Sequence, residues 1–336
     1  MKLASFAYQG RNRIGAQKRE GELVELAVAA AAMGPDWKGG PVPETMLGVI
    51  EAGAHFSGAL RVMAARLGDL DVASIPEAAV TWLPPVTRPG KIIGIAVNNS
   101  GSDSRKISAP NHPMFFLKPS TCLIGHKQHL EVRPYCGGLH PEPELVVVIG
   151  RRTRDVDAAA AMEAVYGYSI MNDITGNAMR AEDQLHYWAL YATEADPTKL
   201  ERREQHLSYT ARYKGADGFG PMGPWLVTRD EIADPGVLDV TCTVGGEVIA
   251  EDSTRYLTYG VAEIISYVSQ YQTLEPGDVI SMGTAFRPQP GSTRSLHTAD
   301  FQRVDGPCEV TITGLGTLSN PIRRTTHKIG AWRLPK

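Results

Sequence analysis

The chain has 336 residues, of which 43% are hydrophobic and 21% charged, and its net charge at pH 7 is only −3. This composition is typical of a globular protein, and the length suffices for one large domain and a smaller one. The weak negative charge gives no reason to expect nucleic acid or an anionic membrane surface as a partner.

The N-terminus and the cysteines bear on the cellular compartment. Residues 1–8 contain no continuous apolar stretch of the kind found in signal peptides, and no run approaches the length of a membrane span. The cysteines are far apart and form no Cys-x-x-Cys pair, which is typical of reduced structural thiols. They are Cys122, Cys136, Cys242 and Cys308. We therefore expect a cytoplasmic protein without a disulfide framework.

The N-terminal quarter combines short strands with helices. Residues 1–26 read as strands interrupted by Gly10 and Gly21, and apolar residues at helical spacing predict helices at 27–33 and 43–67. Prolines and a glycine within residues 84–90 then indicate a linker. The sequence therefore predicts an N-terminal domain of residues 1–84 and a second domain of residues 85–336.

The second domain is expected to be mainly β. An alanine-rich segment at 157–165 and a segment with one apolar face at 261–270 predict helices. The pair Gly245-Gly246 predicts a hairpin turn between two strands. The polar segment from 175 to 213 is expected to be helix plus mobile loop. Apolar runs predict strands at 91–97, 114–118, 145–149, 166–171, 240–244, 247–250, 279–282 and 308–312.

Two glutamates stand two residues apart at the start of the strand predicted at 145–149. Side chains at positions i and i+2 of an extended chain point to the same face, so Glu142 and Glu144 project side by side. Their charges repel unless a proton or a cation neutralises them, and oxygen ligands favour Mg²⁺, Mn²⁺ or Ca²⁺. Asp173, which ends another apolar strand, is the natural third ligand. Solvated acids or salt-bridge partners are the alternative that the residues alone leave open.

Five segments together resemble the fumarylacetoacetate hydrolase family over roughly the C-terminal three-quarters of the chain. Each is modest alone, but they occur in the order in which the family carries them, and Gly283-Thr284 follows the last one. They are FLKPS at 116–120, EPELVVVIG at 142–150, GYSIMND at 167–173, KGADGFGPMGPW at 214–225 and LEPGDVI at 274–280.

The resemblance implies an α+β, mainly β fold, in which a mixed β-sandwich or β-roll core accompanies a smaller N-terminal domain. It also implies a divalent ion, usually Mg²⁺, with Glu142, Glu144 and Asp173 as its ligands. By motif, Lys214 matches the family's active-site lysine, and Thr284 matches the threonine that meets the substrate carboxylate. Family members act on 2-oxo acids and related dicarbonyl compounds, and the resemblance further implies a homodimer.

The chain departs from the family where hydrolytic members carry a His-x-x-Glu pair that activates water. Residues 98–105 contain neither histidine nor glutamate. His112, further along, is the candidate catalytic histidine, and His140 is either a partner of the glutamates or polar packing. The family's arginine four residues after the aspartate is replaced by Asn177, and Arg180 follows it. Asn177 and Arg180 are the candidate substrate contacts.

These features predict a divalent-metal-dependent enzyme that acts on a 2-oxo or 2,4-dioxo acid through a metal-stabilised enolate and cleaves a carbon–carbon bond. Decarboxylation, dehydration or tautomerisation is the alternative, because these reactions need the polarising ion more than a histidine base. A non-catalytic binding protein of the same fold is an alternative of another class. A nicotinamide-dependent oxidoreductase is disfavoured, since no Gly-x-Gly-x-x-Gly follows a strand and opens a helix.

Residues 181–213 form a longer connection than the resemblance leads us to expect between the aspartate and lysine motifs. The segment carries several aromatic and histidine side chains. Long insertions in a compact domain are often functional. The segment is therefore expected to form a substrate lid or a dimer contact.

Overall fold

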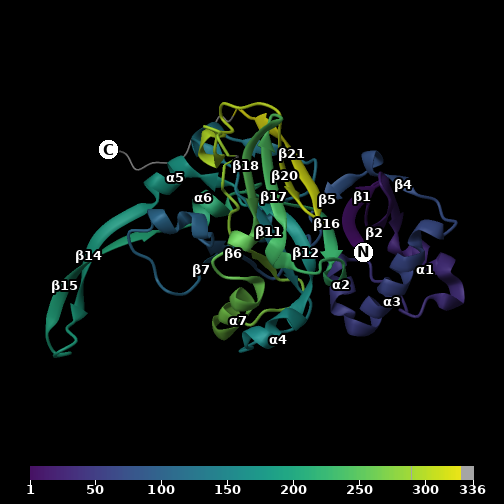
Figure 1. The fold of residues 1–336 in the computed structure, drawn as a ribbon, viewed down its shortest axis with the longest axis horizontal. Helices are drawn as coiled ribbons and strands as arrows, with labels where there is room; N and C mark the ends of the chain where they lie inside the picture. Colours follow the sequence, from purple (N-terminus) through teal and green to yellow (C-terminus); the bar gives the residue numbers. More distant parts are fainter. Residues whose placement is uncertain (289, 327–336) are drawn as a thin grey trace.

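The computed structural model describes residues 1–288 and 290–326, so residues 327–336 of the predicted second domain lie outside the described range. A large sheet runs in the order β4-β3-β2-β1-β16-β12-β11-β19-β6-β7, with β5 beside β1 and β8 beside β16 (Figure 1). A second sheet has the order β18-β17-β20-β21-β9. Within the described ranges, no helix is long and apolar enough to cross a membrane. The fold is α+β and strand-rich, which confirms the predicted fold class.

The N-terminal part is an antiparallel group of strands that packs against helices. Buried apolar side chains from its strands and helices share one core cluster. The helix expected at 43–67 is in fact two helices, because Gly53 adopts a φ of +74° outside the helical region. The elements are β1 (Lys2–Tyr8), β2 (Arg11–Arg19), β3 (Glu22–Glu25), α1 (Leu26–Met33), α2 (Met46–Glu51), α3 (Gly53–Arg66), β4 (Ile75–Pro76) and β5 (Thr81–Leu83).

The large sheet continues from these strands into the rest of the chain. Lys2 and Leu3 of β1 pair with Val227 and Leu226 of β16 (Gly220–Thr228). The strands on both sides of residue 84 therefore belong to one hydrogen-bonded sheet. The division into domains at 84/85 stays a prediction.

The centre of the sheet is β11 (Pro143–Ile149), which lies between β12 (Val165–Asn172) and β19 (Val279–Ser281). All seven residues of β11 are buried, as expected for a continuous apolar run. Beyond β19 follow β6 (Ile92–Ala96), parallel to it, and then β7 (Met114–Lys118). Three shorter strands complete this region. The strand β8 (Leu123–Ile124) pairs with β16, and β10 (Leu139–His140) pairs with β13 (Thr175–Gly176).

The segment LEPGDVI has a structural role at the start of β19. Gly277 adopts a φ of +82°, and the buried Asp278 carboxylate accepts hydrogen bonds from the backbone N–H of Lys91 (3.0 Å) and of Glu275 (2.7 Å). It also forms an ion pair with the Lys91 ammonium group. These bonds fix the turn before β19 beside the beginning of β6, and so position the residues that follow β19.

The second sheet packs against the first through one apolar face. Buried and more exposed residues alternate along β17 (Asp239–Val244) and β20 (Pro307–Ile312), and the buried ones join the core cluster of β11 and β12. Gly245 and Gly246 have φ of 59° and 83°, which confirms the predicted hairpin turn. All four cysteines are buried and free. The remaining strands are β9 (Leu130–Val132), β18 (Glu247–Ser253) and β21 (Gly316–Arg324), the last of which was not expected from the sequence.

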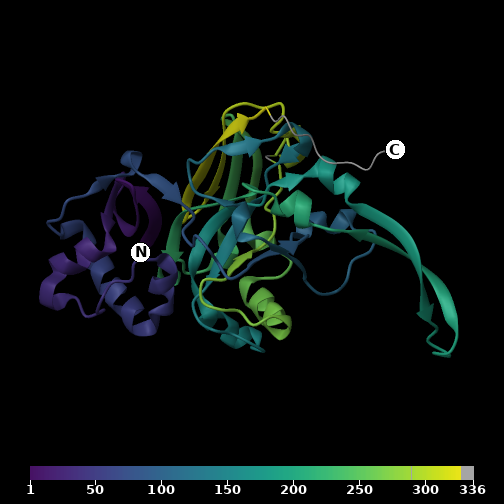
Figure 2. The same cartoon turned by 180° about the vertical axis from the view of Figure 1, so that it is seen from behind.

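The segment from 175 to 213 differs from its prediction as helix plus mobile loop. It contains α5 (Asn177–Glu182), a long hairpin of β14 (Gln184–Ala192) and β15 (Leu200–Ser208), and α6 (Ala211–Gly215). Figures 1 and 2 show this hairpin, which we call the arm, extending away from the body of the molecule. The remaining helices, α4 (Ala158–Ala161) and α7 (Val261–Tyr271), lie side by side next to the central strands.

Candidate functional site

Three carboxylates meet where β11 begins and β12 ends. Pro143 pairs with Asn172 in the antiparallel ladder, so Glu142 and Asp173 come to stand opposite each other. The Asp173 N–H donates to the Glu142 carbonyl (2.8 Å), and the Glu142 N–H donates to Asn172 Oδ1 (2.9 Å). One carboxylate oxygen from each of Glu142, Glu144 and Asp173 lies within 4.8 Å of the others. The structure thus brings together the three predicted metal ligands.

Two lysines approach the cluster. Lys214 of α6 places its Nζ 2.8 Å from Glu142 Oε2 and 2.6 Å from Asp173 Oδ2. Lys118, the last residue of β7, forms an ion pair with Asp173 and donates to the carbonyls of Lys214 (2.5 Å) and Phe219 (3.1 Å). Three carboxyl groups thus face two ammonium groups, and among the described residues no lysine forms an ion pair with Glu144.

Hydroxyl and backbone donors hold the two glutamates. Ser281 Oγ (2.6 Å) and the Gly283 N–H (3.0 Å) donate to Glu144 Oε2, and Thr175 Oγ1 donates to Glu142 Oε1 (2.7 Å). Thr284 Oγ1 lies 2.7 Å from Glu142 Oε2 and 3.0 Å from Glu144 Oε1. Because a hydroxyl carries one proton, it can donate to only one of these carboxylates at a time.

The pKa values of Glu144, Glu142 and Lys214 are shifted by different surroundings. Burial, reinforced by the charge of Asp173, raises the pKa of Glu144 to about 8. Burial acts the same way on Glu142, but Lys214 and His140 outweigh it and hold the pKa of Glu142 well below its ordinary value. Burial opposes the charged form of Lys214, yet Asp173 and Glu142 raise the pKa of Lys214 above its usual range. Lys214 with these neighbours is therefore a fixed positive charge rather than a base.

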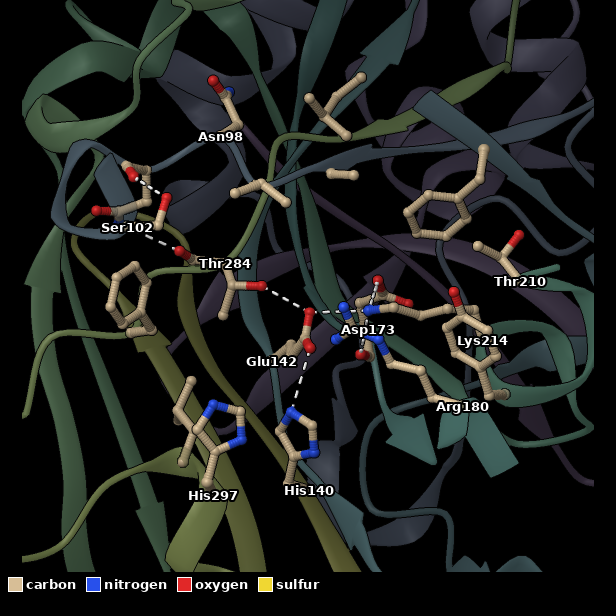
Figure 3. Close-up of a pocket in the computed structure, with 18 of the residues that line it drawn as sticks. Asn98, Ser102, His140, Glu142, Asp173, Arg180, Thr210, Lys214, Thr284 and His297 are labelled. Atoms are coloured by element: carbon tan, nitrogen blue, oxygen red, sulfur yellow. Dashed lines mark hydrogen bonds and ion pairs between the residues drawn. The ribbon is translucent and has the colours of Figure 1, made fainter. Parts of the chain in front are cut away.

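The cluster forms part of the wall of a cavity of about 390 Å³. Two histidines line the same cavity, and Figure 3 shows them side by side near Glu142. His140 Nε2 lies 3.2 Å from Glu142 Oε1, and the Asn177 amide nitrogen lies 2.9 Å from His140 Nδ1. This pattern assigns the His140 proton to Nε2, because Nδ1 accepts from the amide. The His297 ring centroid is 4.7 Å from that of His140.

The predicted substrate contacts are placed as follows. Arg180 of α5 and Thr284 line the cavity, and Figure 3 shows Arg180 directed towards Asp173 and Glu142. Asn177 reaches the site through His140. His112 is not among the lining residues: its ring stacks on Tyr267 of α7 at 5.6 Å and bonds to the Tyr267 hydroxyl at 2.9 Å. The geometry gives the predicted catalytic role of His112 no support.

The segment that lacks His-x-x-Glu nevertheless borders the cavity. Asn98 Nδ2 donates to the Met282 carbonyl (2.8 Å), and Asn99 Nδ2 donates to the Thr284 carbonyl (3.2 Å). The 3₁₀ helix Ser100–Arg105 that follows contributes Ser102 and Arg105 to the cavity wall. The expected place is therefore part of the site, but its side chains are a hydroxyl and a guanidinium group.

Several site residues were missed by reasoning from the sequence. Lys118 stands in a family-like segment, where a lysine ending an apolar strand was the available signal. Ser281, two residues before Gly283, faces Glu144 from the neighbouring strand. Thr175 and His297 reach the site from segments whose position depends on tertiary packing, so no local pattern indicates them.

Comparison with known proteins agrees with this geometry. Residues 91–323 match the family described as fumarylacetoacetate (FAA) hydrolase, C-terminal. The chain belongs to the fumarylacetoacetate hydrolase family. The human protein named oxaloacetate tautomerase FAHD2A, mitochondrial, is 31% identical over 245 residues, which are 72% of this chain and 69% of that protein.

Solved structures of the family share the fold. The 5-carboxymethyl-2-hydroxymuconate delta-isomerase of Mycobacterium smegmatis is 25% identical with a TM-score of 0.64, covering 97% of this chain and 99% of that one. The maleylpyruvate hydrolase of Sphingobium sp. SYK-6, solved with manganese(II) and pyruvate, is 24% identical with a TM-score of 0.67, covering 96% and 99%. This fumarylacetoacetate hydrolase family protein is thus an enzyme, and the non-catalytic alternative is not retained.

Proposed function

We propose that the protein is a divalent-metal-dependent enzyme that moves a proton on a 2-oxo acid, interconverting keto and enol forms through an enolate. The observation that carries the proposal is the cluster of Glu142, Glu144 and Asp173 in a cavity whose neighbouring loop offers Ser102 and Arg105 instead of a water-activating pair. The similarity to an oxaloacetate tautomerase over 72% of the chain supports the same class of reaction.

The donor set fits a hard divalent cation. It consists of oxygens only, and burial with the charge of Asp173 disfavours the ionised form of Glu144, which a cation would stabilise. Held by the three carboxylates, such an ion supplies Lewis-acid polarisation of the 2-oxo group. Mg²⁺ is the proposed ion, with Mn²⁺ or Ca²⁺ as alternatives of similar ligand preference, and manganese accompanies the Sphingobium enzyme of this fold.

The side chains of the cavity bind the substrate, orient it and exchange a proton with it. The Lys214 ammonium group stabilises negative charge as it develops on the substrate. Thr284 and Arg180 orient the substrate carboxylate, and His140, oriented by Asn177, holds Glu142 in place. Burial and the neighbouring His140 lower the pKa of His297, so a neutral ring is available in the cavity to exchange a proton with the substrate carbon.

Cleavage of a carbon–carbon bond, the outcome expected first from the sequence, is the second candidate. One observation favours it: a neutral His297 inside the cavity is also able to accept a proton from a water molecule. The two outcomes differ in their products, because cleavage divides the carbon skeleton and tautomerisation leaves it intact.

The test uses purified protein with Mg²⁺, follows the enol absorbance of oxaloacetate and of an acylpyruvate, and identifies the products by NMR. We expect fast keto–enol equilibration that a chelator abolishes and that Glu144→Gln reduces more than about 100-fold. Ser269→Ala, a buried serine of α7 outside the cavity lining, is the control and is expected to keep full activity. Equilibration that survives both chelation and Glu144→Gln would contradict the proposal, and divided products would select cleavage.

A further inference from the structure

A buried carboxylate of the second sheet reaches the wall of the cavity from behind. Asp252 lies near the end of β18, and its side chain is fully buried. Its Oδ2 accepts hydrogen bonds from the backbone N–H groups of Phe286 (2.8 Å) and Arg287 (3.0 Å). Its Oδ1 forms an ion pair with the Arg287 guanidinium group at 3.2 Å. This side chain thus attaches the segment that follows Thr284 to the second sheet.

The same carboxylate also holds the loop that precedes the 3₁₀ helix Ser100–Arg105. Asn99 Nδ2 donates to Asp252 Oδ2 (3.0 Å) and to the Thr284 carbonyl (3.2 Å), so the two N–H groups of one amide bridge the two segments. Asn99 is the N-cap of this helix, since its Oδ1 accepts from the Gly101 N–H at 2.9 Å. Asp252 therefore also fixes where the helix begins, and the helix contributes two residues to the cavity wall.

The metal cluster is held independently of Asp252. The Met282 N–H and the Ala285 N–H donate to carbonyl groups of β11, at 2.9 Å each. Both sides of Thr284 are therefore joined to the strand that carries the glutamates. A change at Asp252 is expected to loosen two cavity walls, which Figure 3 shows at Ser102 and Thr284, while the three carboxylates keep their places.

We propose that Asp252 is a positioning residue for the reaction: its carboxylate holds residues 98–105 and 284–287 together and so keeps the cavity in the shape that binds the substrate. This inference rests on the proposed function, because it assigns the effect of Asp252 to binding of the 2-oxo acid beside the metal cluster. Asp252 does not itself touch the substrate. It acts through Asn99 and through the backbone of the two segments.

The position requires a carboxylate rather than an amide. Among the described residues, five groups donate to Asp252, two of them from Arg287. An asparagine at this position offers one acceptor oxygen and turns its own N–H groups towards the other donors. It also leaves the Arg287 guanidinium group without its charged partner. Asp252→Asn therefore changes few atoms but disrupts the connection.

The first test is hydrogen exchange of the full-length protein, followed by mass spectrometry. In Asp252→Asn, the amides of residues 98–105 and 286–287 should exchange at least about tenfold faster than in the wild type, while those of β11 keep their wild-type rates. Asp157→Asn is the matched control, because Asp157 also accepts a backbone N–H, that of Ala160 at 2.8 Å, but lies before α4 and outside the cavity lining. Wild-type exchange of both segments in Asp252→Asn would overturn the proposal.

The second test separates binding of the substrate from binding of the metal. With oxaloacetate and Mg²⁺, Asp252→Asn should raise KM about tenfold or more, because the cavity walls no longer hold the substrate in place. The dissociation constant for Mg²⁺, measured calorimetrically, should change less than about twofold, and Asp157→Asn should keep both wild-type values. A loss of metal affinity as large as the rise in KM would mean that Asp252 supports the fold of the whole site, which would overturn the positioning role.

Asn99→Ala tests the same connection with Asp252 in place. We expect it to raise KM as well, and the double variant to be no more impaired than Asp252→Asn alone, since both residues act through one bridge. Effects that multiply in the double variant would overturn this route. Should Asp252→Asn fail to fold, Asn99→Ala decides the test, and an unchanged KM there contradicts the proposal.

The proposed function and this inference fail in different ways. A wild type that does not interconvert the keto and enol forms in the presence of Mg²⁺ contradicts the proposed function, and the role of Asp252 in substrate binding falls with it. An active wild type with an unchanged KM in Asp252→Asn overturns the positioning role alone and leaves the proposed function intact.

Discussion

At the scale of single residues, the three carboxylates of the cluster are not equivalent. Glu142 has an ammonium group and an imidazole beside it. Glu144 is buried, and within residues 1–288 and 290–326 its donors are two hydroxyl groups and one backbone N–H. Glu144 is therefore the carboxylate that a cation would stabilise most, and Ser281 is the residue that fixes its orientation.

We predict that Ser281→Ala weakens binding of Mg²⁺ or Mn²⁺ by about 10- to 100-fold, because Glu144 Oε2 keeps only the Gly283 N–H as donor. The measurement is a calorimetric metal titration. Ser269→Ala, which removes an equally buried hydroxyl from α7, is expected to bind metal like the wild type. Indistinguishable affinities in the two variants would mean that Ser281 does not support a metal ligand.

The sequence predicted those site residues whose position follows from strand geometry. Side-chain alternation placed Glu142 and Glu144 on one face, and pairing of their strand with the one before Asp173 completed the cluster. His112 and His297 illustrate the limit: one was expected near the site and packs on α7, and the other was not expected and lines the cavity. Both stand in loops, where the path of the chain depends on distant contacts.

At the scale of elements, the arm is the part that the sequence described least well. The charged and aromatic residues of its two strands do not alternate in a simple pattern. Which residues of the two strands lie on the same face is decided by the pairing register, which the sequence alone does not indicate. One face carries Trp188, Leu190 and Leu200, exposed by 51%, 57% and 63%. A two-stranded hairpin with exposed apolar residues is marginally stable by itself. The arm connects α5, which carries Arg180, with α6, which carries Lys214.

The homodimer expected from the family resemblance stays a prediction, and the arm offers a test of it. If a second copy covers the apolar face, the double variant Leu190→Glu, Leu200→Glu places charges in the contact and shifts the protein towards monomer. Light scattering coupled to size-exclusion chromatography measures the mass. Val62→Glu, an exposed apolar residue of α3, is the control and should keep the wild-type mass. A dimer unaffected by the arm variant, or a monomeric wild type, would contradict this role.

At the scale of the whole molecule, the N-terminal strands and the last strand meet around His126. Its ring packs edge-on against Trp82 of β5 at 5.3 Å, and Trp82 packs against Trp225 of β16 at 4.9 Å. His126 Nδ1 accepts a hydrogen bond from the Ser319 N–H of β21 at 3.0 Å. An imidazole protonated at Nδ1 cannot accept this bond. Burial, with the nearby Lys127 charge, lowers the pKa of His126 to about 4.

This shift predicts how stability depends on pH. Above about pH 6.5 the ring is neutral in both the folded and the unfolded chain; between about 6.5 and 4 only the unfolded chain binds the proton, so stability falls as the pH decreases. The loss amounts to about 3 kcal/mol at most. His126→Asn keeps an acceptor near Nδ1 but does not titrate, so its free energy of unfolding, from urea denaturation at pH 7 and pH 5, should fall less than that of the wild type. His55→Asn, at an exposed N-terminal position, should retain the wild-type decrease. The prediction would be contradicted if the free energy of unfolding of His126→Asn decreased between pH 7 and pH 5 by as much as that of His55→Asn. In that case the neutral His126 ring would not contribute to the pH dependence of stability.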